Sequence, residues 1–381
     1  MVIAGDEQLR EACEAFRTEP FCAVDTEFLW ERTYLPQVSL VQLGSPAHVV
    51  VIDVLSVNDL TPLGELLQRP DQPKIIHAAS QDIPILRDLT GTDIAPFFDS
   101  QIGAAMAGMR YQISLADLVQ EFLGVAIDKS TQRTNWLERP LSDKQLQYAA
   151  DDVRLLAALY PLLLARLEEL GRRAWAEADS ARLLSDSQGV AIAPAEAHLQ
   201  IKGGGRLSPR GQLLFQRLAA WREQEAMAAD LRPRLLMPDA TIADIAKHGS
   251  LPGPAELRHM RHAVRRRFER LLPSIEELVE ATAAVPEEAL PTPPRHRRPS
   301  AAEKALLEKG VTLAGETAKR LGIPASVLAT RADISELVRD PYESGKEPVS
   351  VLLSTWRRDV FGQALLDLVF GTRPEPEPTL F

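Results

Sequence analysis

The chain has 381 residues, enough for two or three domains at roughly 100–200 residues each. Its hydrophobic content of 45% and charged content of 25% are ordinary for a soluble globular protein. A net charge of −10 argues against a protein that binds nucleic acid indiscriminately through a positive surface, although it does not exclude a local basic track.

Short β-rich runs alternate with helical stretches in the first half of the chain. Strands are predicted, in chain order, at residues 21–27, 38–43, 49–52, 74–77 and 94–98. A helix is predicted at 61–67, with Thr61 as its N-cap and Pro62 at its first position, and another from about Ser80. This alternation indicates an α/β layer fold, and the early cluster of three strands favours a mixed sheet over a purely parallel one.

A long helix is predicted to begin after Ser142, because Ser142 and Gln145 have the spacing of a capping box. The apolar pattern continues to Leu170, with a kink expected at Pro161 and an end at Gly171.

Strand signals stop at about residue 190, and the remainder is predicted to be helical. We expect five regions: an α/β domain at 1–190, helical domains at 207–282 and 301–371, a proline-rich linker at 283–300 and a disordered tail at 372–381.

The compartment is predicted from three features. No apolar run approaches the roughly 20 residues that cross a bilayer. The first ten residues include Asp6 and Glu7 and lack the basic-then-apolar pattern of a signal peptide. Two cysteines, Cys13 and Cys22, argue against a disulfide scaffold and fit a reducing compartment. We therefore expect a cytoplasmic protein.

Two acids lie in the first of the five predicted strands. Asp25 and Glu27 are two residues apart, so both side chains point to the same face of the sheet. The flanking residues are apolar, and burying two like charges side by side is unfavourable without a partner. On these residues alone, a solvated edge strand with two acids of no special role remains an equal alternative.

Further candidates lie near two predicted helix starts. Asp82 lies close to a helix N-terminus, where acids are common and mildly stabilising, so that alone it favours a structural role. Tyr148 and Asp152 are four apart on the long helix and share a face. Asp151, three residues from Tyr148, is not excluded by spacing.

Together these side chains fit the hydrolysis of a phosphodiester. Two divalent ions about 3.5–4 Å apart can supply a nucleophile and stabilise the leaving oxygen. Carboxylates are the hard ligands that Mg²⁺ prefers. Asp25 would bridge the ions, Glu27 and Asp152 would bind one, and Asp82 would help to bind the other. Tyr148, with an ordinary pKa of about 10, would be neutral and would orient the attacking water.

Three motifs resemble those of a known family. Residues 24–28 (VDTEF), 77–82 (HAASQD) and 148–152 (YAADD) look like the exonuclease motifs of the ribonuclease D family. The resemblance implies a ribonuclease H-like fold and a site of four acids and a tyrosine. It selects Asp152 over Asp151, because the family's tyrosine precedes the metal-binding aspartate by four residues. The implied catalytic set is Asp25, Glu27, Asp82, Tyr148 and Asp152, with Mg²⁺ or Mn²⁺ on the four acids.

The run 128–136 is similar to the family's segment before the last motif, except that Asn135 stands where aspartate is expected. Candidate RNA contacts in the nuclease domain are His77, Lys129, Gln132 and Arg133.

The helical half is similar to the helicase-and-RNase-D C-terminal (HRDC) domain. Residues 207–282 carry this resemblance through Trp221 and its neighbours and through their position, and residues 301–371 look like a second, diverged copy. We expect Trp221 and Trp356 to lie in cores.

A basic stripe is also predicted. Apolar residues at helical spacing should face the core, namely Met260, Val264, Phe268 and Leu271. Three arginines then share another face, namely Arg258, Arg261 and Arg265. With Lys202, Arg206 and Arg210 they would bind phosphates and extend an RNA track. A solvated charged face is equally compatible with the pattern.

We therefore expect removal of nucleotides from RNA 3′ ends as nucleoside 5′-monophosphates. The resemblance implies transfer RNA precursors and other small structured RNAs as substrates, and no membrane or obligate protein partner. A DNA-directed 3′–5′ exonuclease is one alternative, although the chain leaves no room for a polymerase domain. A non-catalytic RNA-binding protein is the other, although all four acids and the tyrosine are present.

Overall fold

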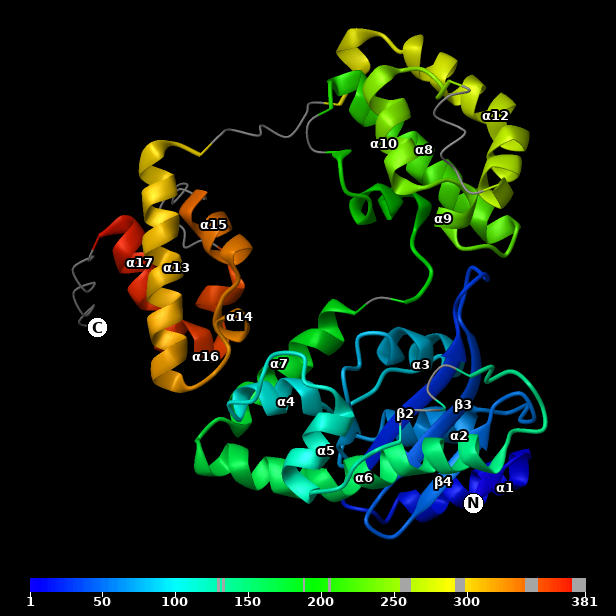
Figure 1. Ribbon diagram of the computed structural model, residues 1–381, viewed down its shortest axis with the longest axis vertical. Helices are drawn as coiled ribbons and strands as arrows, with labels where there is room; N and C mark the ends of the chain where they lie inside the picture. The colour runs from blue at the N-terminus through cyan, green and yellow to red at the C-terminus, as the bar shows by residue number, and fades with distance from the viewer. Residues whose placement is uncertain are drawn as a thin grey trace, which may run out of the picture. The chain divides into compact units, whose positions relative to one another are not determined.

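The chain forms two compact units, whose helices and strands are labelled in Figure 1. The computed structural model describes residues 1–128, 131, 134–187, 189–204, 207–253, 262–291, 299–339 and 349–371. Unit 1 comprises Met1–Glu27, Val38–Gln188 and Arg298–Phe381, and unit 2 comprises Phe28–Gln37 and Gly189–Arg297. The expected domains at 1–190, 207–282 and 301–371 are thus grouped differently, because the last of them belongs to the same unit as the first.

A six-stranded sheet forms the centre of unit 1, in the order β1-β4-β3-β2-β5-β6. Its strands are β1 (Val2–Ile3), β2 (Cys22–Leu29), β3 (Gln37–Gly44), β4 (Val49–Asp53), β5 (Lys74–Ile76) and β6 (Phe97–Asp99). β3 and β4 are antiparallel, with Val41 opposite Ile52, whereas β2, β5 and β6 pair in parallel. The prediction of a mixed sheet is confirmed, although β1 was not predicted.

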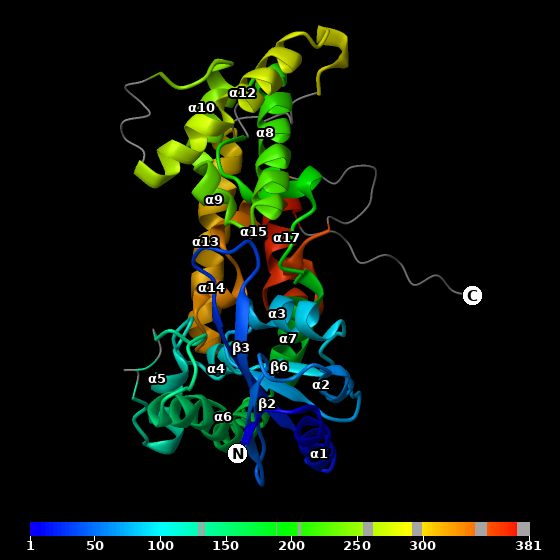
Figure 2. The same ribbon diagram turned by 90° about the vertical axis from the view of Figure 1, so that its right-hand side faces the viewer.

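Seven helices of unit 1 surround this sheet. They are α1 (Asp6–Phe16), α2 (Thr61–Leu67), α3 (Asp82–Thr90), α4 (Ser100–Met106), α5 (Leu115–Leu123), α6 (Asp143–Glu169) and α7 (Arg173–Asp186). Alternate residues of β2 enter different cores: Cys22 and Val24 pack on the side of α1, α2 and α3, and Ala23 packs on the side of α6. In Figure 2, β2 lies between α6 and α1.

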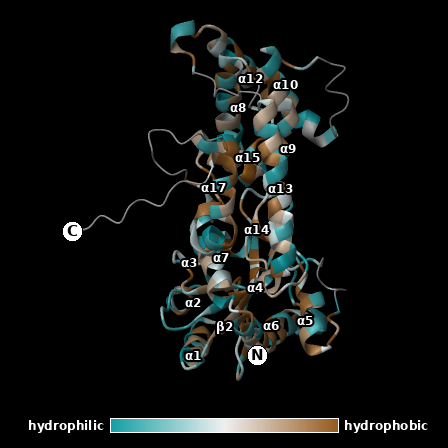
Figure 3. Cartoon of the chain, turned by 90° about the vertical axis from the view of Figure 1, so that its left-hand side faces the viewer, coloured by the Kyte–Doolittle hydropathy of each residue, from teal (hydrophilic) through white to brown (hydrophobic). Residues whose placement is uncertain are grey.

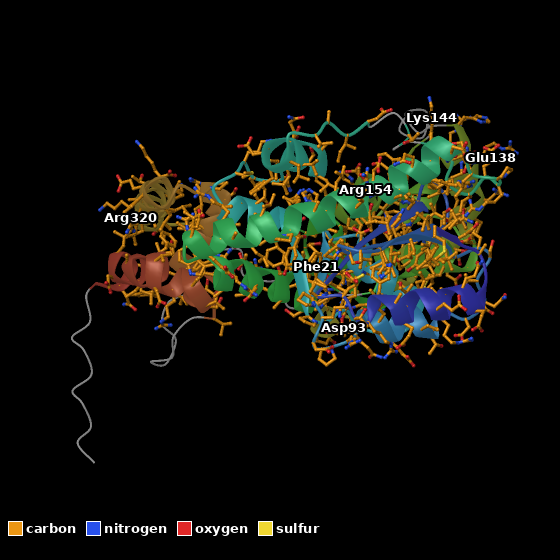
Figure 4. All side chains as sticks on the ribbon, turned by 90° about the horizontal axis from the view of Figure 1, so that it is seen from below. Phe21, Asp93, Glu138, Lys144, Arg154 and Arg320 are labelled. Carbon is orange, nitrogen blue, oxygen red and sulfur yellow. The ribbon has the colours of Figure 1, made fainter. Side chains whose placement is uncertain are left out.

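Helix α6 is the longest helix in the described part of the chain. The predicted capping box is confirmed, since Ser142 Oγ accepts from Gln145 N and the Gln145 side chain accepts from Ser142 N. Lys144 and Arg154 lie along the helix (Figure 4). The helix continues past Pro161, and Gly171, with φ of +65°, follows its C-cap.

One predicted helix cap and one predicted strand start differ from the structure. Helix α2 begins as predicted, but its N-cap is Leu60 rather than Thr61, and no side chain caps it. The strand predicted at 94–98 begins only at Phe97, directly after Pro96, whose ring nitrogen has no hydrogen to donate to a strand partner.

The C-terminal helices of unit 1 pack against its nuclease part. They are α13 (Ala301–Leu321), α14 (Ala325–Leu328), α15 (Arg331–Arg339), α16 (Thr355–Arg357) and α17 (Gln363–Phe370), with a π-helical turn at Arg358–Gly362. Their apolar residues join those of α4, α5, α6 and α7 in one cluster, and Trp356 stacks on Trp175 with ring centroids 4.5 Å apart. The mixture of brown and teal along α13 in Figure 3 is that of an amphipathic helix.

Unit 2 is helical apart from its first segment, Phe28–Gln37, which includes the end of β2. Its elements are η1 (Pro194–Gln200), α8 (Pro209–Ala228), α9 (Pro233–Leu236), α10 (Asp239–His248), α12 (His262–Ala283) and η3 (Glu287–Ala289). Phe268 is fully buried and Trp221 packs against the same core, as predicted. Among the residues that the structure describes, no helix is both long and apolar enough to cross a membrane.

Candidate active site

Three carboxylates converge between β2 and α6. Oxygen atoms of Asp25, Glu27 and Asp152 all lie within 4.8 Å of one another. Asp25 and Glu27 lie on the same face of β2 as Ala23, whose side chain packs in the core beside α6. Asp152 faces them from that helix. The structure therefore brings together three of the four predicted acids.

A glycine permits the close approach of α6 to the sheet. A Cβ atom at Gly44, at the end of β3, would lie 2.5 Å from the carbonyl oxygen of Val153. Any larger residue there would displace the helix that carries Asp152.

Asp82 lies beside this cluster. It is the first residue of α3, and its Oδ1 accepts a hydrogen bond of 2.5 Å from Thr26, the residue between Asp25 and Glu27. Its charge raises the pKa of both strand acids, so it acts on them electrostatically, although it is not one of the three carboxylates within 4.8 Å.

Burial and mutual repulsion shift the acids toward their protonated forms. Burial, followed by the charges of Asp152, Asp82 and Glu27, raises the pKa of Asp25 well above its usual value. Burial, followed by the charges of Asp152 and Asp82, raises the pKa of Glu27 to about 8. Burial raises the pKa of Asp82 and of Asp152 to about 6. A cation bound to this carboxylate cluster would relieve the repulsion.

Tyr148 lies one helical turn from Asp152 and forms a hydrogen bond with its carboxylate. Burial and then the charges of Asp152, Glu27 and Asp25 raise the pKa of Tyr148 above its ordinary range. Its hydroxyl is therefore neutral, as predicted.

Asp151 and Asp152 point in different directions. Asp151 pairs with Arg154 and accepts a hydrogen bond of 2.7 Å from Gln147, on the outer side of α6. Spacing alone left both aspartates open, and the geometry brings only Asp152 into the cluster.

The donor set fits a hard divalent cation. The three converging residues offer only carboxylate oxygens, which are the ligands that Mg²⁺ and Mn²⁺ prefer. Asp25, Glu27 and Asp152 are the residues that would hold such an ion, with Asp82 beside them.

The structure gives less support to the predicted RNA-binding residues than to the predicted acids. Both ring nitrogens of His77 form hydrogen bonds within the protein, with Ser100 Oγ at 2.9 Å and the carbonyl of Ile113 at 3.0 Å. These bonds argue against a contact between His77 and RNA, which stays a prediction. Six others lie outside the described residues, namely Lys129, Gln132, Arg133, Arg206, Arg258 and Arg261.

The described arginines of the basic stripe have protein partners. Arg265 pairs with Glu269 at 3.4 Å while remaining about a third exposed. Arg210 donates to the carbonyls of Thr282, Ala283 and Val285, each at 2.8 Å. Arg210 thus stabilises the C-terminal end of α12, a role that its position in the sequence did not reveal.

Asp99 is a polar residue of this region that the sequence analysis missed. It is the N-cap of α4 and lies at the end of β6, and it is almost fully buried. The available signal was an aspartate between a predicted strand and a helical stretch, which indicates a cap but not its long-range partners.

Two family models match the chain. A 3′-5′ exonuclease model matches residues 1–168, and an HRDC domain model matches residues 212–275. The chain is 35% identical to ribonuclease D of Pseudomonas paraeruginosa over 376 residues, covering 96% of each chain. It is 33% identical to ribonuclease D of Escherichia coli over 380 residues, covering 97% of this chain and 98% of that one.

Solved structures are similar to this chain in fold. The crystal structure of Escherichia coli RNase D, described as an exoribonuclease involved in structured RNA processing, has 30% sequence identity and a TM-score of 0.86, covering 97% of this chain and 98% of that one. The catalytic core of RRP6 from Trypanosoma brucei, at 22% identity and a TM-score of 0.57, shares the fold over 74% of this chain and 80% of that one. The chain therefore belongs to the ribonuclease D family and is a hydrolase of the 3′–5′ exoribonuclease type.

Proposed function

We propose that this exoribonuclease works with two divalent ions, Mg²⁺ or Mn²⁺, held by Asp25, Glu27, Asp82 and Asp152. The observation that carries the proposal is the convergence of three carboxylates within 4.8 Å, beside a fourth and a neutral tyrosine. When bound, the ions supply positive charge that lowers the pKa of the attacking water and stabilises the leaving oxygen.

The proposed reaction is the hydrolysis of the phosphodiester at the 3′ end of the RNA. Water adds to the phosphorus of the last phosphodiester, and the bond from phosphorus to the 3′ oxygen of the preceding nucleotide breaks. That oxygen gains a proton, so the products are a nucleoside 5′-monophosphate and an RNA with a new free 3′ hydroxyl.

Tyr148 has a positioning part in this scheme. Because its pKa is raised, Tyr148 keeps its proton and cannot act as the base, and its O–H group donates a hydrogen bond to the Asp152 carboxylate. Its oxygen remains free to accept a hydrogen bond from the attacking water and so to orient it.

We propose transfer RNA precursors and other small structured RNAs as substrates. The name of the Escherichia coli relative, which refers to structured RNA processing, supports this choice. The HRDC match at 212–275 supports a nucleic-acid-binding role for unit 2. Residues 301–371 are proposed as a second, diverged HRDC-like domain, and a cytoplasmic location, consistent with two free buried cysteines, remains a prediction.

The first experiment uses RNA and DNA of one sequence, each labelled at the 5′ end and free at the 3′ end. The protein and its Asp25→Ala variant are incubated with each substrate in Mg²⁺, Mn²⁺ or chelator. We expect a ladder that shortens from the 3′ end, preferentially on RNA, and that requires both metal and Asp25.

Other results would favour the alternatives. Equal or better digestion of DNA would assign the chain a DNA substrate, since contact with the ribose 2′-hydroxyl is what separates the two. Tight RNA binding without hydrolysis under any metal would leave a binding protein on a nuclease fold.

A further inference from the structure

The loop that precedes Asp82 is held in an uncommon conformation. It connects β5 to α3, and Ala78 within it has φ of +60°, a region that residues with a Cβ rarely adopt. Such a conformation persists only where the surroundings enforce it. The position of Asp82 therefore depends on what holds this loop.

Asp99 holds the loop through its carboxylate. Oδ1 accepts from the amide of Ala78 at 3.2 Å, and Oδ2 accepts from the amide of Ala79 at 2.9 Å. The same carboxylate caps α4 by accepting from Gln101 N at 2.7 Å and Ile102 N at 3.3 Å. One buried side chain thus joins the start of α4 to the loop before Asp82.

Helix α7 holds Asp99 in turn. The backbone amide of Asp99 donates to Ser180 Oγ at 3.0 Å, and Ser180 is fully buried. The preceding residue on α7, Asp179, is also buried, so α7 presents two adjacent polar side chains to the interior.

Asp179 binds the C-terminal helices. Its two carboxylate oxygens accept from Arg357 Nη1 at 2.6 Å and Nη2 at 2.7 Å, and Oδ1 also accepts from Trp356 Nε1 at 3.3 Å. Arg357 further donates to the carbonyls of Leu328 at 3.1 Å and Val327 at 2.7 Å. The Arg357 and Asp179 side chains are each only 6% exposed, so the ion pair is desolvated. Its two parallel hydrogen bonds fix the guanidinium relative to the carboxylate.

We propose that the C-terminal helices α13 to α17 position Asp82 for catalysis through Arg357, Asp179, Ser180 and Asp99. None of these four is a catalytic residue, since each acts through the next. Arg357 donates hydrogen bonds to Asp179, Leu328 and Val327, which argues against a direct contact with phosphate. The proposal rests on the role proposed above for Asp82.

The network also borders a cavity of about 310 Å³. Ala78, Asp99, Asp179 and Arg357 all line it, so residues from both ends of the network border the same cavity. Loss of one link leaves room for its neighbours to move, rather than being resisted by dense packing.

The test measures metal binding separately from hydrolysis, on the full chain. The variants are Asp99→Asn, Ser180→Ala and Arg357→Lys, the last of which keeps the charge but loses the fork. Their melting temperatures are recorded against Mn²⁺ concentration, and kcat and KM are measured on labelled RNA.

The matched control is Arg222→Gln in unit 2. Arg222 is also a buried arginine, 4% exposed, whose Nη1 donates to Met237 O and to Asp239 Oδ1, each at 2.8 Å. The substitution removes the ion pair between a buried arginine and a partly exposed aspartate, and the described hydrogen bonds of this arginine lie within unit 2, whereas the loop before Asp82 belongs to unit 1.

We expect the Mn²⁺ concentration for half-maximal stabilisation to rise about tenfold in Asp99→Asn, with kcat reduced by a similar factor and KM within about twofold. Ser180→Ala and Arg357→Lys should likewise raise the Mn²⁺ concentration for half-maximal stabilisation and lower kcat, each by about threefold or more. Arg222→Gln should lower the melting temperature without shifting either one.

Two outcomes would overturn the proposal. One is a fall in melting temperature in all the variants with unchanged Mn²⁺ dependence and unchanged kcat, as in the control. The other is a fall in RNA affinity alone, which would make the C-terminal helices an RNA-binding surface. Asp82→Asn is measured alongside: if it leaves the Mn²⁺ dependence unchanged, the role of Asp82 fails rather than the network.

Discussion

The hydroxyl of Tyr34 donates a hydrogen bond of 2.6 Å to Oε1 of Glu223. Both side chains are buried, and both belong to unit 2. Tyr34 lies in the connection between β2 and β3, directly beyond the strand that carries Asp25 and Glu27. A second contact in the same unit, from Arg232 N to Arg32 O at 2.9 Å, also holds this connection.

We predict that Tyr34→Phe destabilises the protein by about 1–3 kcal/mol, because it leaves the buried Glu223 carboxylate without this donor. Burial, followed by Glu223 itself, raises the pKa of Tyr34, so the hydroxyl keeps its proton at neutral pH. Chemical denaturation measures the change. Tyr111→Phe is the control, since Tyr111 is 52% exposed and its substitution should change stability by less than about 0.5 kcal/mol.

Asp152→Asn and Asp151→Asn form a matched pair on α6. Asp152→Asn removes a carboxylate from the cluster proposed to hold metal, and we expect hydrolysis to fall by at least about 100-fold. Asp151→Asn removes the outward-facing ion pair with Arg154 and the carboxylate that accepts from Gln147, and it should leave hydrolysis within about twofold. Initial rates on 5′-labelled RNA distinguish the two, and equal losses would contradict the assignment of Asp152.

Tyr148→Phe should separate chemistry from metal binding. The ring and its packing remain, but the water-orienting oxygen is lost, so we expect kcat to fall about 100-fold. Stabilisation of the protein by Mn²⁺ should persist. Tyr160→Phe, another buried tyrosine of α6, is the control and should leave kcat unchanged. A loss of Mn²⁺ stabilisation in Tyr148→Phe would mean that Tyr148 supports the metal site instead.

The metal-free protein should lose stability as the pH rises. The pKa of Glu27 is raised to about 8 and those of Asp82 and Asp152 to about 6, above unfolded values of about 4. The folded state therefore binds more protons than the unfolded state between about pH 4 and pH 8, so the free energy of unfolding falls with rising pH across this window.

Melting temperatures in chelator at about pH 5 and pH 8 measure this dependence. Asp25→Asn removes one of the repelling charges and should flatten this dependence more than Asp151→Asn, because the charge of Asp151 contributes only after burial to the raised pKa of Asp152. Adding Mg²⁺ at the higher pH should restore stability to the unsubstituted protein. A metal-free protein that is more stable at pH 8 than at pH 5 would contradict the electrostatics described for the site.

Local chemistry along the sequence determined much of the site. The two-residue spacing of Asp25 and Glu27 in a strand decides that they share a face, because side chains alternate. The capping box at Ser142 and Gln145 determines where α6 begins, because it satisfies backbone donors within one turn. Each of these follows from residues close in the chain. β1, with only two residues, was too short for a periodic pattern to reveal it.

Tertiary structure alone decided the relationships between distant residues. That Asp82 accepts from Thr26, that Asp99 holds the loop before Asp82, and that Arg357 joins the C-terminal helices to α7 all depend on how helices pack on the sheet. The sequence motifs name residues for the chemistry, but a hydrogen bond between residues far apart in the chain requires both elements to be in place. Such contacts exist only once burial has assembled the cores around them, which is why no local pattern could determine them.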